Sequence, residues 1–135
     1  MTRLQGLYET ADGLGLQICH LPMERLTAIS TPDGFIGMDV DKLETSAQET
    51  VCLAHEMGHC LTGSFYTVDT GLQQRQRCEE RADRWAMGQL VPLEELKQVL
   101  QGGITCTYEL AEHFDVPEPF LCRCIQYYKE AKGAL

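Results

Sequence analysis

Residues 55 to 59 read H-E-M-G-H, and this short motif constrains the fold more than any other feature of the chain. In an α-helix, residues four positions apart lie one above the other, so His55 and His59 present their rings to the same side of one helix. Two imidazoles at this spacing can bind a single metal ion. Glu56 stands about 100° around the helix from His55, because a turn holds roughly 3.6 residues. It can therefore lean over the ion and hold a water molecule without being a ligand.

The motif is a poor candidate for a chance match. With only four histidines in the chain, H-E-x-x-H would arise by accident with a probability of roughly one per cent. A histidine packed in a helical core is common, but two of them at this spacing around a glutamate indicate a metal site. The arrangement is typical of zinc peptidases.

A catalytic zinc site needs three protein ligands and an open fourth position, so another segment must supply one more donor. The best source is C-E-E-R-A-D-R-W-A, residues 78–86. On a helical wheel Glu79 shares its face with Ala82, whose small side chain lets a neighbouring helix approach. We expect Glu79 to be the third ligand. Glu80 and Asp83 are the alternatives, and Asp83 can instead accept a hydrogen bond from a histidine N–H. Salt bridges on a surface helix are the other interpretation of these carboxylates.

The hydrophobic pattern predicts an α+β fold, with three short strands between an opening helix and a mainly helical remainder. We expect the strands to form a small antiparallel meander packed on the helices. Strands are predicted at residues 16–20, 26–31 and 35–40, and helices at 4–14, 46–61, 73–90, 92–100, 105–114 and 118–132.

Four residues mark how the helix of the histidine motif begins, packs and ends. Ser46 and Glu49 have the spacing of a capping box at its start. Gly58 lies on the same face as the histidines, where the missing Cβ would let another element come close. Gly63 is a natural stop at its end.

A length of 135 residues fits one domain. Within it we expect a catalytic core over residues 1–103 and a C-terminal helical segment over residues 104–135. No apolar run is long enough to span a membrane, and the N-terminal residues lack the core of a signal peptide, so we expect a cytoplasmic protein. The net charge of −9 argues against nonspecific binding to nucleic acid, which depends on basic residues.

Seven cysteines are an odd number, and no C-x-x-C pair occurs, so a full disulfide framework is not expected. Cys52 and Cys60 flank the histidine motif, and Cys78 precedes Glu79. Thiolate ligation, or oxidation that regulates the site, therefore stays open beside simple packing. Cys122 and Cys124 form C-x-C, for which packing is the first interpretation and a metal or redox pair the second.

The motifs together resemble the ImmA/IrrE group of gluzincin-type metallopeptidases. The matching segments are L-A-H-E-M-G-H at 53–59, E-x-x-A-D-x-W-A at 79–86 and L-V-P at 90–92. Members typically show A-H-E-L-G-H, E-x-x-A-N-x-F-A and L-L-M-P, so the similarity runs from about residue 34 to residue 92. Residues 109–117 resemble the closing helical segment of the family. The main departure is Asp83 in place of the usual asparagine, which adds a carboxylate near the site.

The resemblance implies a zincin-like core in which His55, His59 and Glu79 bind Zn²⁺ and Glu56 is the catalytic base. The activity that follows is that of a zinc metalloendopeptidase. ImmA-like members are typically encoded by phages or mobile elements and act against helix-turn-helix repressors, relieving transcriptional repression. A repressor of this kind is therefore the expected protein partner, with no direct contact to nucleic acid or membrane.

Peptide hydrolysis also needs a donor for the oxyanion and a surface that holds the substrate. Tyr66 and His113 are the first candidates for the oxyanion donor, ahead of Tyr108 and His20. In gluzincins an edge strand before the metal helix binds the substrate in extended form. The strand that corresponds to it here contains Phe35, Ile36, Gly37 and Met38.

Two other classes of function compete with the peptidase. The segment 108–128 has the short-helix, turn, longer-helix pattern of a DNA-binding motif. Its charge argues against that function, because five acids and three bases follow residue 103: Glu109, Glu112, Asp115, Glu118 and Glu130 against Arg123, Lys129 and Lys132. The second alternative keeps the metal but not the hydrolysis, giving a metal-binding anti-repressor or sensor that acts by protein binding.

Overall fold

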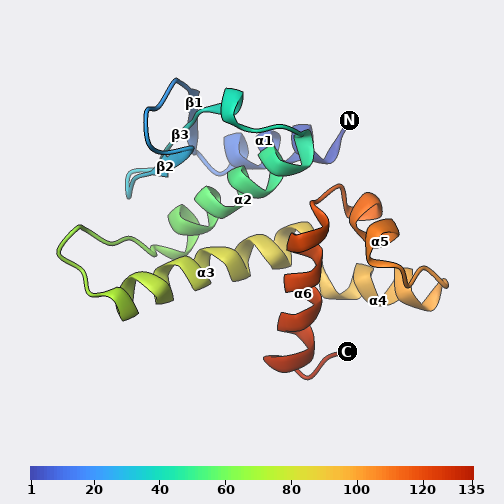
Figure 1. Cartoon of the computed structure of the whole chain (residues 1–135). Helices are drawn as coiled ribbons and strands as arrows, with labels where there is room; N and C mark the ends of the chain where they lie inside the picture. Colours follow the sequence, from blue (N-terminus) through green and yellow to red (C-terminus); the bar gives the residue numbers. More distant parts are fainter. The chain divides into compact units, whose positions relative to one another are not determined.

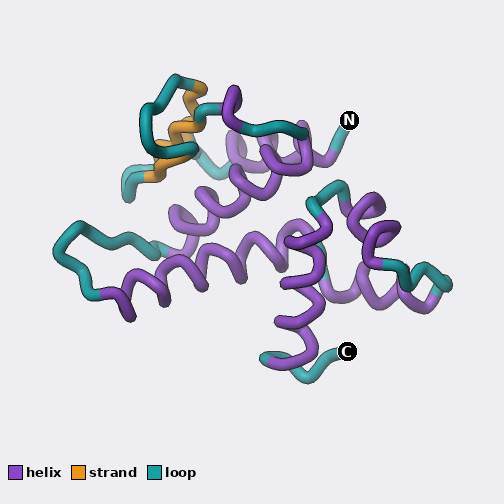
Figure 2. Tube along the Cα trace, viewed as in Figure 1, coloured by secondary structure: helices purple, strands orange, loops and turns teal.

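The structure is a computed structural model that describes residues 1–135. It contains six α-helices and one small three-stranded sheet (Figure 1), which confirms the α+β fold. Figure 2 shows the strands gathered in one region, with a single helix before them and helices alone after them. The elements are α1 (Arg3–Gly13), β1 (Gln17–His20), β2 (Ala28–Ser30), β3 (Phe35–Met38), the 3-10 turn η1 (Val40–Lys42), α2 (Ser46–Thr62), α3 (Leu72–Leu90), α4 (Leu93–Gln101), α5 (Thr107–Phe114) and α6 (Glu118–Glu130).

The pairing of the strands differs from the expected antiparallel meander. The order in the sheet is β1-β3-β2, with β3 parallel to β1 and antiparallel to β2. The prediction of an all-antiparallel sheet was therefore wrong. The last strand lies in the middle, and the free edges of the sheet belong to β1 and β2.

The two connections explain this order. A tight turn joins β2 to β3, with the N–H of Gly34 donating to the carbonyl of Thr31 at 3.0 Å and with Gly34 at φ +89°. Between β1 and β2, residues 21–27 instead carry the chain past the end of β3, where the N–H of Leu21 donates to the carbonyl of Met38 at 2.9 Å. Alternating apolar residues specify the faces of a strand but not its neighbours, so the sequence pattern could not reveal this crossing.

Helix α2 carries the histidine motif, and its ends are set by local hydrogen bonds. The N-cap is Thr45, whose side chain accepts a hydrogen bond from the N–H of Gln48 at 3.1 Å. The capping box predicted at Ser46 and Glu49 was thus one residue out of register. At the other end Gly63 adopts φ 65° and closes the helix as predicted.

Gly58 allows α2 to lie directly against α3. A Cβ added to Gly58 would come within 2.5 Å of the carbonyl oxygen of Ala82 and 2.9 Å of its Cα. The close approach expected from the sequence is confirmed. It brings the histidines of α2 next to the acidic residues of α3.

The chain divides into two compact units, residues 1–86 and residues 87–135. The first has a core shared by the sheet, α2 and α3, and the second a core of helical residues. Fully buried apolar side chains are Ile36, Met38, Leu53, Met57 and Ala82 in the first unit and Leu96, Leu121 and Cys124 in the second. A division of the chain at residue 103 stays a prediction. No helix combines the length and the apolar character that crossing a membrane requires.

Candidate metal centre

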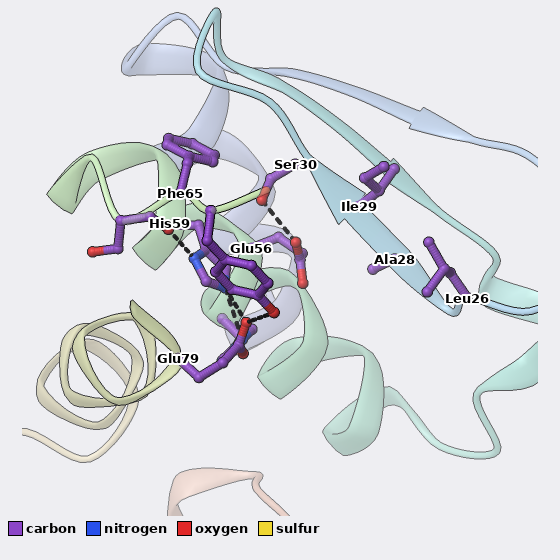
Figure 3. Close-up of a pocket in the computed structure, with 11 residues that line it drawn as sticks. Leu26, Ala28, Ile29, Ser30, Glu56, His59, Phe65 and Glu79 are labelled. Atoms are coloured by element: carbon purple, nitrogen blue, oxygen red, sulfur yellow. Dashed lines mark hydrogen bonds and ion pairs between the residues drawn. The ribbon is translucent and has the colours of Figure 1, made fainter. Parts of the chain in front are cut away.

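His55 and His59 on α2 and Glu79 on α3 converge on one point at the wall of a cavity, and their ligand atoms all lie within 4.8 Å of one another. Figure 3 shows His59 and Glu79 pointing toward one another there. The Nε2 atom of His55 is 2.8 Å from Oε2 of Glu79, and Nε2 of His59 is 3.2 Å from Oε1 of the same carboxylate. The two Nε2 atoms are 3.2 Å apart. The structure therefore brings together the three residues that the sequence singled out as ligands.

The outer nitrogens of both rings are held by acceptors. Nδ1 of His55 lies 2.8 Å from Oδ1 of Asp83, and Nδ1 of His59 lies 2.5 Å from the backbone carbonyl of Ser64. A carbonyl or carboxylate oxygen can only accept, so both Nδ1 atoms donate, and in a neutral ring each Nε2 then presents a lone pair. Two lone pairs and a carboxylate thus face one another. Such a cluster of acceptors suits a cation.

The donor set fits zinc in chemistry and in spacing. Two imidazole nitrogens and one carboxylate oxygen are a known ligand set of catalytic zinc sites. With bonds of about 2.0–2.1 Å, the donors of a tetrahedral zinc ion lie roughly 3.3–3.4 Å apart. The two nitrogens are 3.2 Å apart, and each lies 2.8 or 3.2 Å from a different oxygen of Glu79. With one ligand atom from each residue the donors lie within 4.8 Å of one another, so a small rotation of the carboxylate would accommodate the ion.

The two alternative third ligands lie elsewhere. Asp83 contacts the outer nitrogen of His55, so it supports the ring and does not join the three converging donors. Glu80 lies 3.7 Å from a guanidinium nitrogen of Arg84 in an i,i+4 ion pair and is outside the cluster.

The surroundings of His55 and Glu79 shift the pKa values of these two residues. Burial of the His55 ring lowers its pKa, but the hydrogen bond and charge of Asp83, with the charges of Glu56 and Glu79, outweigh burial and raise the pKa. Burial acts on Glu79 in the opposite sense and raises its pKa. The hydrogen bond from Tyr66 and the two nearby imidazoles then bring the pKa of Glu79 below its usual value. The site therefore favours the ionised form of Glu79 and a positive charge next to this carboxylate.

Glu56 lies beside the cluster without belonging to it, as expected for a residue that is not a ligand. Its Oε1 accepts a hydrogen bond of 2.8 Å from the hydroxyl of Ser30 on β2. Figure 3 shows this contact at the wall of the pocket. Sequence analysis missed Ser30, because a lone serine in a short strand carries no signal that it meets a residue 26 positions further on.

A cavity of about 460 Å³ opens in front of these residues. Its walls come from the loop before β2, from β2, from α2, from the loop after α2 and from α3. The lining residues are Leu26, Ala28, Ile29, Ser30, His55, Glu56, His59, Ser64, Phe65, Tyr66 and Glu79.

Tyr66, a predicted oxyanion donor, lies in this cavity. Its hydroxyl donates a 2.8 Å hydrogen bond to Oε1 of Glu79, and this bond raises the pKa of Tyr66. Arg75 holds the loop around it, with its guanidinium 5.6 Å from the centre of the Tyr66 ring and its Nε donating to the carbonyl of Thr70 at 2.8 Å. The hydroxyl therefore lies beside the three converging donors.

The other three candidate donors have surroundings of their own. His113 belongs to the second unit, where its Nε2 lies 2.9 Å from a carboxylate oxygen of Glu95, and its role in the site stays a prediction. Nε2 of His20 lies 2.8 Å from the hydroxyl of Tyr8. Tyr108 is 61% exposed in the second unit.

The predicted substrate edge at Phe35, Ile36, Gly37 and Met38 was wrong. These residues form β3, which is hydrogen-bonded on both sides, so it offers no free backbone to a substrate. The strand that lines the cavity and keeps one free edge is β2. The error follows directly from the strand order, which the sequence did not reveal.

No cysteine belongs to the cluster of converging donors, and none of the seven forms a disulfide. The Sγ atoms of Cys60 and Cys78 each lie 3.7 Å from a backbone carbonyl oxygen. Burial, with the charges of Glu56 and Glu49, raises the pKa of Cys52 to about 11. Cys52 is therefore a poor source of a thiolate ligand.

Comparison with known protein families gives a match over residues 13–125 to a peptidase family whose model is described as IrrE N-terminal-like domain. The match covers α2, α3 and every residue of the converging cluster. Comparisons with the curated proteins and with the solved structures give no match.

Proposed function

The chain belongs to the peptidase family of IrrE N-terminal-like domains, and on that premise we propose that it is a zinc-dependent endopeptidase. The observation that carries the proposal is the convergence of two imidazole lone pairs and one carboxylate beside a further, separately held carboxylate. The first three groups suit a metal ion, and the fourth suits a proton carrier.

In this proposal His55, His59 and Glu79 hold the ion. Zinc bound there would supply a Lewis acid that polarises a peptide carbonyl and makes water more acidic. Glu56 takes a proton on its carboxylate and returns it to the leaving amine. The hydroxyl of Ser30 occupies Oε1 of Glu56 at 2.8 Å, which orients the carboxylate and leaves Oε2 for the proton.

Tyr66 and Asp83 complete the chemistry. The Tyr66 hydroxyl already reaches Oε1 of Glu79. By turning from that oxygen toward the substrate, it can donate to the oxygen of the carbonyl as negative charge develops there. Asp83 keeps the ring of His55 in the orientation and tautomer that its role requires.

We propose that the substrate binds as an extended strand along the free edge of β2. The N–H of Thr31 donates to the carbonyl of Phe35 on β3, and the carbonyl of Thr27 accepts from the N–H of Asp39, the residue after β3. Because bonding alternates along an antiparallel pair, the backbone groups of Ala28 and Ser30 point away from β3 and toward the free edge. A peptide that pairs there would lie next to Glu56, and backbone pairing of this kind accepts many sequences.

The substrate class follows from the resemblance described above. We propose that the substrate is a helix-turn-helix repressor of a phage or mobile element, cleaved in the cytoplasm so that repression is relieved. The charge of −9 is compatible with a protein partner and unfavourable for direct contact with DNA. The alternative is a metal-binding anti-repressor or sensor that inactivates its partner without hydrolysis.

The decisive experiment compares the wild-type protein with Glu56→Gln. Both proteins are loaded with zinc, and their metal content is measured by elemental analysis. Each is then incubated with a helix-turn-helix repressor whose gene lies next to the gene of this protein. We expect equal zinc in both proteins and cleavage by the wild type that falls by at least about 100-fold in the variant, because the proton carrier is lost.

His55→Ala is the matched control, since it removes a ligand and should abolish both zinc binding and cleavage. The same proteins are compared for their ability to relieve repression. Derepression that persists in Glu56→Gln at full zinc content would contradict the peptidase hypothesis and support the hypothesis of an anti-repressor that acts by binding. Wild-type protein that contains zinc and leaves the repressor intact would contradict the choice of substrate.

A further inference from the structure

We propose that a second, apolar pocket beside the metal cavity selects substrates that carry a large apolar side chain. The pocket has a volume of about 370 Å³ and is lined by Met23, Glu24, Arg25, Leu26 and Ile29. The inference rests on the proposed function, because it assigns the pocket to the peptide that binds along β2. Its occupant is one aliphatic or aromatic side chain of that peptide.

The pocket is built on a glycine in the central strand. Gly37 of β3 lies opposite Ile29 of β2. A Cβ added to Gly37 would meet Cε of Met23 at 3.1 Å and Cγ2 of Ile29 at 3.4 Å. The missing side chain thus lets Met23 lie against the sheet next to Ile29, and a larger residue would push it out.

The loop that forms the rest of the pocket is anchored. The backbone N–H of Met23 donates to Oδ2 of Asp39 at 3.0 Å, and Asp39 is buried, with 7% of its surface exposed. A second hydrogen bond, from Nζ of Lys42 to the backbone carbonyl of Leu26 at 2.9 Å, holds the other end of the loop. Both ends of the segment 23–26 are therefore held, so the pocket keeps its shape without a ligand.

Apolar surface remains uncovered at this place. Leu26 is 53% exposed and Ile29 is 42% exposed. Covering such side chains with another apolar group is favourable by roughly 25 cal/mol for each Å² removed from water. A charged side chain would lose hydration in the same place, so the pocket discriminates against it.

The pocket is continuous with the metal cavity, because Leu26 and Ile29 line both. Figure 3 shows Leu26, Ala28 and Ile29 together on the side of the cavity away from Glu79. Along β2, Ile29 points to the opposite face from Ala28 and Ser30. A peptide residue paired beside Ile29 presents its side chain to the same face, which is where the pocket opens. The pocket would therefore bind the side chain of one substrate residue, which lies at a fixed distance from the bond that is cleaved.

The test begins with the zinc-loaded wild type and a mixed peptide library, with cleavage sites identified by mass spectrometry. We expect leucine, methionine or phenylalanine to be enriched at one fixed position. Two peptides that differ only there, leucine against alanine, are then compared. Loss of a few methylenes from an apolar contact predicts a kcat/KM lower by at least about tenfold for the alanine peptide.

The variant Leu26→Asp should remove the preference for leucine, so that the kcat/KM values of the leucine and alanine peptides become equal, whereas the control variant should keep the preference. The matched control is Leu14→Asp, because Leu14 is 52% exposed and Leu26 is 53% exposed, and Leu14 lines neither cavity. Leu26→Ser serves as a milder second change, and circular dichroism verifies the fold of all three. A preference for leucine that survives in both Leu26 variants would overturn the proposal.

Binding provides a readout that does not require hydrolysis. Fluorescently labelled leucine and alanine peptides are titrated into zinc-loaded Glu56→Gln, with and without Leu26→Asp. Tighter binding of the leucine peptide that disappears with Leu26→Asp supports the pocket even if the wild type cleaves nothing, an outcome that would remove only the peptidase. Equal binding of both peptides to Glu56→Gln would overturn the pocket.

Discussion

Each histidine of the converging cluster uses both of its ring nitrogens. The inner nitrogens of His55 and His59 meet the carboxylate of Glu79, and the outer ones meet Asp83 and the carbonyl of Ser64. The outer contacts determine which nitrogen carries the proton and how each ring is turned. Metal affinity therefore depends on residues that need not touch the metal.

Replacing Asp83 tests this dependence. We expect Asp83→Ala to weaken zinc binding by about 10- to 100-fold, because the ring of His55 loses its acceptor. Asp83→Asn keeps an oxygen that accepts from Nδ1, so its affinity should lie closer to the wild-type value. Competition with a chromophoric chelator measures both constants. Unchanged affinity in Asp83→Ala would show that the contact does not support the ring.

Ser30 offers a second test at the level of one hydrogen bond. Its hydroxyl donates to Glu56, and hydrogen bonds to charged groups contribute about 1.5–3 kcal/mol. If that contact orients the proton carrier, Ser30→Ala should lower kcat by about tenfold or more, with zinc content and KM near the wild-type values. Ser30→Thr keeps the hydroxyl and should restore most of the rate. A fall in KM or zinc content with kcat unchanged would contradict this role.

Among the elements, the packing of α2 on α3 determines whether the ligands meet. Two of them lie on α2 and the third on α3, and the helices touch where Gly58 faces the backbone of Ala82. Separation of the two helices would therefore affect fold and metal site together.

Gly58→Ala is expected to separate them. The new Cβ would lie 2.5 Å from a backbone oxygen, and backbone cannot give way as a flexible side chain can. Overpacking of this kind costs about 1–3 kcal/mol, and zinc affinity should fall as well. The matched control is Gly88→Ala on α3, where nothing lies within 4 Å and alanine should stabilise the helix by about 0.5–1 kcal/mol. Urea unfolding measures both, and equal stability of the two variants would refute the close contact.

The second unit has its own buried polar contact. The hydroxyl of Tyr128 on α6 donates to the carbonyl of Val91 at 2.7 Å. Burial, with the nearby Cys124 and Tyr127, raises the pKa of Tyr128 to about 12. The unfolded chain ionises this residue near pH 10, so the contact contributes its full stability below about pH 10 and loses it as the pH rises toward 12.

Tyr128→Phe should therefore be less stable than the wild type by about 1 kcal/mol at neutral pH. The difference in stability between the two proteins should shrink between about pH 10 and pH 12, because ionisation of Tyr128 destabilises the wild type and the variant lacks this hydroxyl. Urea unfolding at about pH 8 and about pH 11 tests it. A difference that stays constant over this range would contradict the contact.

The elements also show how far the sequence could predict the molecule. Helices come from local periodicity, so their ranges were close, and the spacing of His55 and His59 with the inward face of Glu79 predicted which residues converge. The close contact at Gly58 could be predicted because glycine is unfavourable inside a helix, and close packing is one of the few reasons for it to occur there. The order of the strands and the contact of Ser30 with Glu56 depend on a crossing loop and on packing between distant segments. No local pattern encodes either, and the incorrect substrate edge followed from the same cause.

On the scale of the whole molecule, all three residues of the converging cluster belong to the first unit, residues 1–86. A metal that binds only the folded state stabilises that state, by about 2.7 kcal/mol when its free concentration is 100 times the dissociation constant. Zinc should therefore protect the first unit more than the second.

Hydrogen exchange measured with zinc and with a chelator should reveal this difference. We expect slower exchange in α2 and in the first half of α3 when zinc is present, and little change in α5 and α6. The variant His55→Ala should show no effect of zinc. An equal increase in protection across both units would mean that the two units unfold together.

If the substrate binds along β2 as proposed, the shortness of this strand limits which proteins can be cleaved. Only three residues, Ala28–Ser30, offer a free edge, and a chain that pairs with them has to be stretched out over the same length. A segment coiled in a stable helix cannot satisfy that geometry until it unravels locally. The rate of cleavage would then depend on how often the target segment unfolds locally. Selection among substrates would follow local mobility more than sequence.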